Sequence, residues 1–120
     1  MAKMKGFYIT YGIFTEDIET FVKDIEIELG IKLIKDEFAE NQEVYYLDKS
    51  QKNKISCFSI FYGNSLGYYL NKSQKIHPFF LISCNIILNE NDKIEYVQKL
   101  QNTLKSKKYV RELNFDTDEW

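Results

Sequence analysis

The sequence has few of the residues that most often build catalytic or metal sites. It contains one histidine, two cysteines, one proline and five glycines. Structural zinc sites take several Cys or His ligands, and small secreted domains need a framework of disulfides, so His77, Cys57 and Cys84 are too few for either. It also has no glycine-rich phosphate loop, nucleophile elbow or paired-cysteine motif. We therefore expect no catalytic residue, no metal and no cofactor.

Long apolar runs are scarce as well. The longest uncharged stretch, residues 55–71, is just short of a membrane span and is interrupted by Gly63-Asn64-Ser65 and Gly67. The first six residues lack the apolar run and the small-residue cleavage site of a secretory signal. These absences predict a cytoplasmic protein with no membrane segment.

What the chain does contain is enough for one folded domain. Its 120 residues include nine Tyr, nine Phe and one Trp, which is too much apolar and aromatic material for a disordered chain. With so little proline and glycine, no stretch has the composition of a linker. We expect a single domain over residues 1–120, in which 116–120 form an acidic tail.

Apolar periodicity predicts an α+β order of elements. The alternation of Phe7, Ile9, Tyr11 and Ile13 indicates a strand with one buried face. The stripe Ile18, Phe21, Val22, Ile25 and Leu29 indicates a helix over 16–29, capped by Thr15 and ended by Gly30. A second helix is expected to start at Asn91 or Asp92 and to bury Ile94, Val97, Leu100 and Leu104. The expected strands are 6–14, 31–38, 43–48, 55–62, 66–70, 79–88 and 109–115.

Consecutive strands between two helices favour a mainly antiparallel sheet of five to seven strands with two helices packed on one face. The alternating strand and helix order of a doubly wound fold is absent.

Charge is strongly segregated along the chain. Residues 15–48 hold eleven carboxylates and three lysines, whereas residues 49–88 hold five lysines and no carboxylate. Such a field influences which partners approach, and exposed apolar side chains ringed by acid suit a basic partner. The alternative is a solvated face that only keeps the protein soluble. The expected contact residues are Glu16, Asp17, Asp24, Ile27, Glu28, Asp36, Glu37, Glu40, Glu43, Tyr45 and Tyr46.

Other functions remain open at this level. An aromatic pocket lined by Tyr62, Tyr68, Tyr69 and Phe79 would suit a small-molecule or peptide binding module. An enzyme would have to combine His77 with a distant carboxylate. Lysines beside aromatic strands can bind single-stranded nucleic acid, but one Arg and a net charge of −2 argue against it.

Two short segments carry a resemblance to a known class of proteins. Leu29-Gly30-Ile31 at a helix end, followed by Val44-Tyr45-Tyr46-Leu47 in an acidic strand pair, resembles small immunity proteins of bacterial toxin systems. The resemblance implies a cytoplasmic, non-enzymatic protein that neutralises a cognate toxin, such as a basic nuclease, by covering it. We therefore expect a toxin protein as the partner, and neither nucleic acid nor a membrane.

Overall fold

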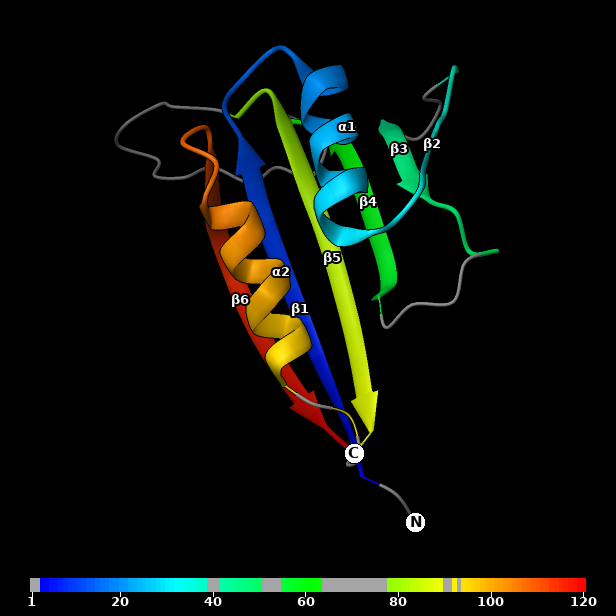
Figure 1. Ribbon diagram of the computed structural model, residues 1–120, viewed down its shortest axis with the longest axis vertical. Coiled ribbons are helices and arrows are strands. Elements are labelled where there is room, and N and C mark those ends of the chain that lie inside the picture. The colour runs from blue at the N-terminus through cyan, green and yellow to red at the C-terminus, as the bar shows by residue number, and fades with distance from the viewer. Residues whose placement is uncertain (1–2, 39–41, 51–54, 64–77, 90–91, 93) are drawn as a thin grey trace.

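The computed structural model describes residues 3–38, 42–50, 55–63, 78–89, 92 and 94–120. Six strands and two helices follow one another along these residues (Figure 1). They are β1 (Met4–Ile13), α1 (Ile18–Leu29), β2 (Leu33–Lys35), β3 (Glu43–Leu47), β4 (Ile55–Tyr62), β5 (Phe80–Asn89), α2 (Glu95–Lys105) and β6 (Val110–Glu119).

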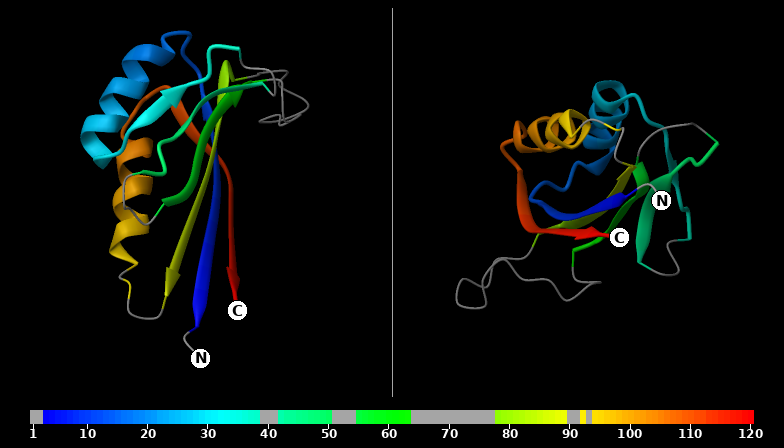
Figure 2. Two further views of the ribbon diagram at one scale, coloured as in Figure 1. Left: turned by 90° about the vertical axis from the view of Figure 1, so that its right-hand side faces the viewer. Right: turned by 90° about the horizontal axis from the view of Figure 1, so that it is seen from below.

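The strands form one open antiparallel sheet in the order β2-β3-β4-β5-β1-β6. Both helices lie on the same face of this sheet, as the view from below in Figure 2 shows. The predicted α+β class, with two helices on one face of an antiparallel sheet, is confirmed.

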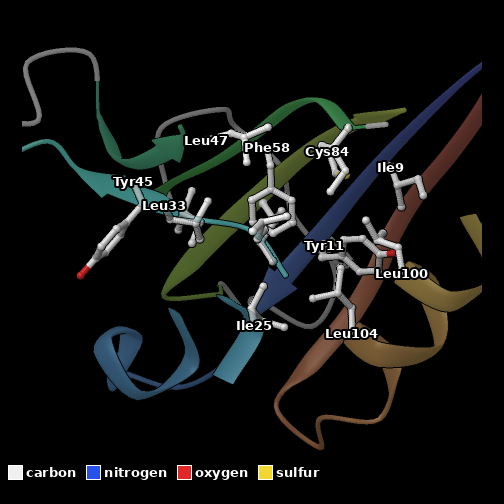
Figure 3. Close-up of a cluster of buried hydrophobic side chains, with 14 of the residues drawn as sticks. Ile9, Tyr11, Ile25, Leu33, Tyr45, Leu47, Phe58, Cys84, Leu100 and Leu104 are labelled. Carbon is white, nitrogen blue, oxygen red and sulfur yellow. The ribbon is translucent and has the colours of Figure 1, made fainter. Parts of the chain in front are cut away.

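The core lies between the helices and this face. Successive side chains of a strand point to opposite faces, so the odd residues of β1 from Phe7 to Ile13 share the helix side. They are paired with the even residues of β5 from Phe80 to Ile86. Figure 3 draws Ile9 and Tyr11 in one buried cluster with Leu100 and Leu104 of α2. The period-two pattern in the sequence therefore marked the buried face of β1.

Helix α1 buries its apolar stripe as predicted, but its first residue and its cap differ. The helix begins at Ile18, and Asp17 rather than Thr15 is the N-cap, since Asp17 Oδ1 accepts a hydrogen bond from the Thr20 N–H at 3.2 Å. Thr15 Oγ1 instead accepts from the Asp17 N–H. Gly30 ends the helix at φ 64°, and its N–H donates to the Glu26 carbonyl, which confirms the predicted C-terminal signal.

Helix α2 begins later than expected, at Glu95. Val97, Leu100 and Leu104 are buried as predicted, but Ile94 is 50% exposed because it precedes the first helical turn. Of the two residues at which the helix was expected to start, Asp92 lies before its first turn and Asn91 is outside the described residues.

Two strand predictions also differ from the structure, and a third falls outside the described residues. β2 has three residues where 31–38 were expected, and the expected strand at 66–70 lies outside the described residues. β6 extends to Glu119 and pairs with β1 as far as Lys5, so residues 116–119 of the expected tail belong to the sheet. The ten-residue β1 provides a full-length template for this pairing, which local composition does not show.

Candidate functional site

The outer side of α1 is the clearest part of the predicted contact surface. Ile27 is 82% exposed, and it lies on the side of the helix opposite the buried Phe21, Val22 and Ile25. An isoleucine so exposed on a charged helix is an apolar point that a partner could desolvate. Residues 16–29 carry six carboxylates and one lysine, Lys23, which lies one turn before Ile27.

The carboxylates of α1 divide between two flanks, and a lysine stands on each. On the flank toward α2, Lys107 Nζ donates to Glu28 Oε1 at 2.8 Å, and this bond raises the pKa of Lys107, with a further contribution from Asp24. On the flank toward β2, Lys35 Nζ lies 3.8 Å from Glu19 Oε1. Exposed pairs of this kind contribute little to stability, but they lower the negative potential of the surface.

Two carboxylates of α1 have local structural roles. Asp17 accepts hydrogen bonds from both the N–H and the hydroxyl of Thr20, which lower the pKa of Asp17. Glu26 Oε2 accepts from the Leu33 N–H at 3.0 Å and so ties the helix to the start of β2. Glu16 is exposed just before the helix. The acidic sequence of α1 therefore serves both folding and surface charge.

The segment after β2 adds two acidic residues and one apolar residue that was not predicted. Asp36 Oδ1 accepts from the Phe38 N–H at 3.1 Å, and Glu37 is exposed. Phe38 is 83% exposed, as large a fraction as that of Ile27. Its position next to Asp36-Glu37, at the end of a strand, was the sequence signal that could have identified it. Glu40 lies outside the described residues.

Strand β3 does not contribute to the same surface as α1. Tyr45 is only 7% exposed and belongs to the core, so the prediction that it is an exposed contact residue is wrong. Tyr46 is exposed, but it is paired with Ser59 of β4, which in turn is paired with Ser83 of β5 and through it with Thr10 of β1. In β4, Ser59 alternates with the core residues Phe58 and Ile60, so Tyr46 and the positions paired with it face away from the helices. Ser59 and Thr10 are nevertheless buried on that far face.

Glu43 is paired with Phe61 on this same far face. The expected contact residues therefore do not form one continuous surface. Of the predicted residues, those of α1 share one helix, Asp36 and Glu37 follow β2, and Glu43 and Tyr46 lie on the opposite side of the sheet. The cause is the strand alternation, which directs neighbouring residues of β3 to opposite faces.

Two hollows open at the surface of the described residues. One, of about 330 Å³, lies where β1 begins and β5 ends and is lined in part by Lys5, Phe7, Leu88 and Ile94. The other, of about 310 Å³, lies along β3 and β4 and is lined in part by Glu43, Tyr46, Cys57 and Ser59. Neither is the predicted aromatic pocket.

The aromatic pocket and the basic loops remain predictions. Tyr62 and Phe79 are exposed and line neither hollow, and Tyr62 stacks on Phe80 with ring centroids 6.0 Å apart. Their expected companions, Tyr68 and Tyr69, lie outside the described residues, and so does His77. Of the five lysines considered for nucleic acid, only Lys49 is described.

The cysteines are free in the structure. Cys84 is completely buried in the core, and burial raises the pKa of its thiol above the ordinary value. Cys57 is half-buried, with its Sγ 3.8 Å from Ser59 Oγ. Within the described ranges, no three Asp, Glu, His or Cys side chains converge in a way that could hold a metal ion.

Neither α1 nor α2, the two helices of the described chain, combines the length and apolar character needed to cross a bilayer. No protein-family model, curated protein or solved structure matches this chain.

Proposed function

We propose that this protein is a non-enzymatic inhibitor of the immunity type, which binds a basic domain of a cognate bacterial toxin and covers it. The observation that carries the proposal is the outer side of α1, where Ile27 is 82% exposed among carboxylates. An apolar centre with an acidic surround favours a basic partner in two ways. The carboxylates accelerate encounter, and the burial of Ile27 stabilises the complex once it forms.

Charge on the neighbouring helix supports one orientation of the partner. Residues 95–108, which include α2, hold four lysines and one glutamate, so they are as clearly basic as α1 is acidic. α1 and α2 lie side by side (Figure 1). A basic domain is thus attracted to the outer side of α1 and repelled by α2, and this would hold it toward the β2 side, where Phe38 is also exposed.

Such an inhibitor acts in the cytoplasm, before the toxin reaches its target. Two cysteines that form no disulfide suit a reducing compartment. The proposal requires no catalytic group, metal or cofactor, since inhibition comes from covering the toxin.

The product of the adjacent gene is the partner to test, because immunity proteins are encoded beside their toxins. We expect its toxicity to be relieved by co-expression of this chain, and the purified proteins to form a one-to-one complex. The association rate should fall as salt is added, because screening weakens attraction between exposed charges. The absence of a complex at low salt would refute the proposal.

Ile27→Lys tests the surface itself. Burial of one isoleucine contributes about 1.5–3 kcal/mol, so the variant should bind roughly 10- to 100-fold more weakly and protect less. Ile94→Lys is the matched control, since Ile94 is also exposed but stands at the start of α2. Both variants should unfold at the same denaturant concentration as the wild type. Equal binding by the two variants would mean that the outer side of α1 is not the contact surface.

A further inference from the structure

Strand β6 forms one edge of the sheet, and none of the other strands in the described part of the chain pairs with its outer side. It runs for ten residues, whereas β2 at the opposite edge has three. Long exposed edges are templates for the addition of another strand, and proteins commonly shorten, cover or charge them. β6 is not short, and residues 114–120 are all exposed, so the edge is accessible over most of its length.

The backbone pairing shows which groups of β6 point outward. Met4 and Trp120 exchange two hydrogen bonds, of 2.8 and 3.0 Å, so the N–H and C=O of Trp120 point toward β1. Backbone groups alternate in direction along an antiparallel strand. The N–H and C=O groups of Thr117 and Glu119 therefore point away from the sheet, toward any strand that would be added.

Both of these outward N–H groups are occupied by an aspartate of the same strand. The Thr117 N–H donates to Asp116 Oδ1, and the Glu119 N–H donates to Asp118 Oδ1, each at 2.9 Å. The carboxylates thus cover the donors that a neighbouring strand would need. A strand can pair with this edge only if something draws the two carboxylates away.

The charge of β6 indicates which kind of strand could do so. β6 holds one arginine and four carboxylates. Glu112 pairs with Lys105 and Glu119 with Lys5, at 3.6 and 3.7 Å, whereas Asp116 and Asp118 have no ion-pair partner among the described residues. A second copy of β6 would bring acid against acid, which is unfavourable between neighbouring strands. A lysine- or arginine-rich strand would instead give both carboxylates a cationic partner.

We propose that the outer edge of β6 is a docking site for an extended, basic segment of a partner protein, which adds to the sheet as a seventh strand. Lysine or arginine side chains of the segment draw Asp116 and Asp118 from the amides, and backbone carbonyls of the segment accept the released N–H groups. The aspartates thereby close the edge to neutral and acidic strands and admit a basic one. The proposal is independent of the inhibitor function, because the contact surface on α1 is separate from β6.

The test uses a synthetic, fluorescein-labelled peptide of about ten alternating lysine and threonine residues, which matches the length of β6. Its binding to the full chain is followed by fluorescence anisotropy at low salt. A peptide of alternating lysine and proline is the control, since it keeps the charge but loses half of its N–H groups and resists the strand conformation. We expect the first peptide to bind at least about tenfold more tightly than the second.

Thr117→Pro is the decisive variant of the protein. It removes an outward N–H and leaves the inward hydrogen bonds to β1, so it is tolerated at an edge but should weaken binding at least about tenfold. Thr117→Val is the matched control, because it keeps the N–H and should bind as the wild type does. In NMR spectra of the wild type, the peptide should shift the amide signals of Thr117 and Glu119, which tests the site even if the proline variant does not fold.

Two double variants test whether peptide binding depends on the β6 edge itself or only on the net charge of the protein. Asp116→Asn with Asp118→Asn should weaken peptide binding and reduce its dependence on salt. Glu16→Gln with Asp24→Asn removes the same charge from the region of α1 and should weaken peptide binding much less. Equal effects of the two double variants, peptide-induced shifts confined to α1, or dimers joined through β6 in sedimentation experiments would each overturn the proposal.

Discussion

The side chain of Tyr11 offers the sharpest test of the core. Tyr11 is completely buried on the helix side of β1, and within the described structure its hydroxyl oxygen has no hydrogen-bond partner. An unsatisfied buried hydroxyl costs about 1–3 kcal/mol. Tyr11→Phe removes it and keeps the ring, at the loss of a few atomic contacts of about 0.1–0.2 kcal/mol each. We therefore expect the variant to be more stable than the wild type by about 1 kcal/mol.

The change is measurable by denaturation with guanidinium chloride, followed by circular dichroism. In thermal unfolding of a 120-residue chain, a gain of 1 kcal/mol in the free energy of unfolding corresponds to a rise of about 4 °C in the melting temperature. Tyr46→Phe is the control, since Tyr46 is exposed on the far face of the sheet and its change should stay within about 0.5 kcal/mol. A loss of 1 kcal/mol or more in Tyr11→Phe would show that the hydroxyl is hydrogen-bonded and would refute the reasoning.

The same variant tests a pH dependence. Burial, with a smaller contribution from Glu112, raises the pKa of Tyr11 above its ordinary value of 10.0. Above pH 10 the unfolded chain therefore loses the Tyr11 proton while the folded chain keeps it, and stability falls by up to about 1.4 kcal/mol per pH unit. Below pH 10 the Tyr11 hydroxyl is protonated in both the folded and the unfolded chain, so none of this stability is lost. Tyr11→Phe has no hydroxyl to titrate and does not show the loss at higher pH. The stability advantage of the variant should thus grow as pH rises above 10.

Three further predictions concern two glycines and the cap of α1. A Cβ at Gly63 would overlap the carbonyl oxygen of Pro78, so Gly63→Ala should cost about 1–3 kcal/mol or more in chemical denaturation. Gly30→Ala, where nothing lies near the Cβ but φ is 64°, should cost about 1 kcal/mol, and equal stability of both variants with the wild type would contradict these backbone positions. Asp17→Ala should lower the melting temperature more than Thr15→Ala, because Asp17 is the cap. Hydrogen bonds from Thr20 lower the pKa of Asp17, so the difference should be present above pH 4 and shrink as the pH falls below the ordinary value of 3.8. A larger loss in Thr15→Ala would overturn that assignment.

Much of the fold followed from local patterns. The alternation in β1, the stripe of α1 with Gly30 at its end, and the apolar faces of β4 and β5 each depend on the spacing of side chains along one element. The prediction of Thr15 as the cap of α1 was wrong, because Thr15 and Asp17 are both competent N-cap residues and their order alone does not show where the helix starts. The structure selects Asp17, since the helix starts at Ile18.

The candidate site was predicted less well, for a reason visible in β3. Val44-Tyr45-Tyr46-Leu47 is apolar without alternation, so the sequence contains no signal for which tyrosine faces the core. The pairing of Tyr45 with Ile60 and of Tyr46 with Ser59, next to a register shift after Glu43, makes that choice. Pairing with β4 therefore removed Tyr45 from the surface and carried Glu43 and Tyr46 to the far face.

By itself the sequence determined which segments become strands and helices, which side of α1 is buried, and that the first helix is acidic. These properties depend on residues a few positions apart. The order of strands in the sheet was decided only by tertiary structure, and with it the position of β6 at an edge and the outward direction of the amides that Asp116 and Asp118 cover. Contacts between segments a hundred residues apart decide such features, and no local pattern encodes them.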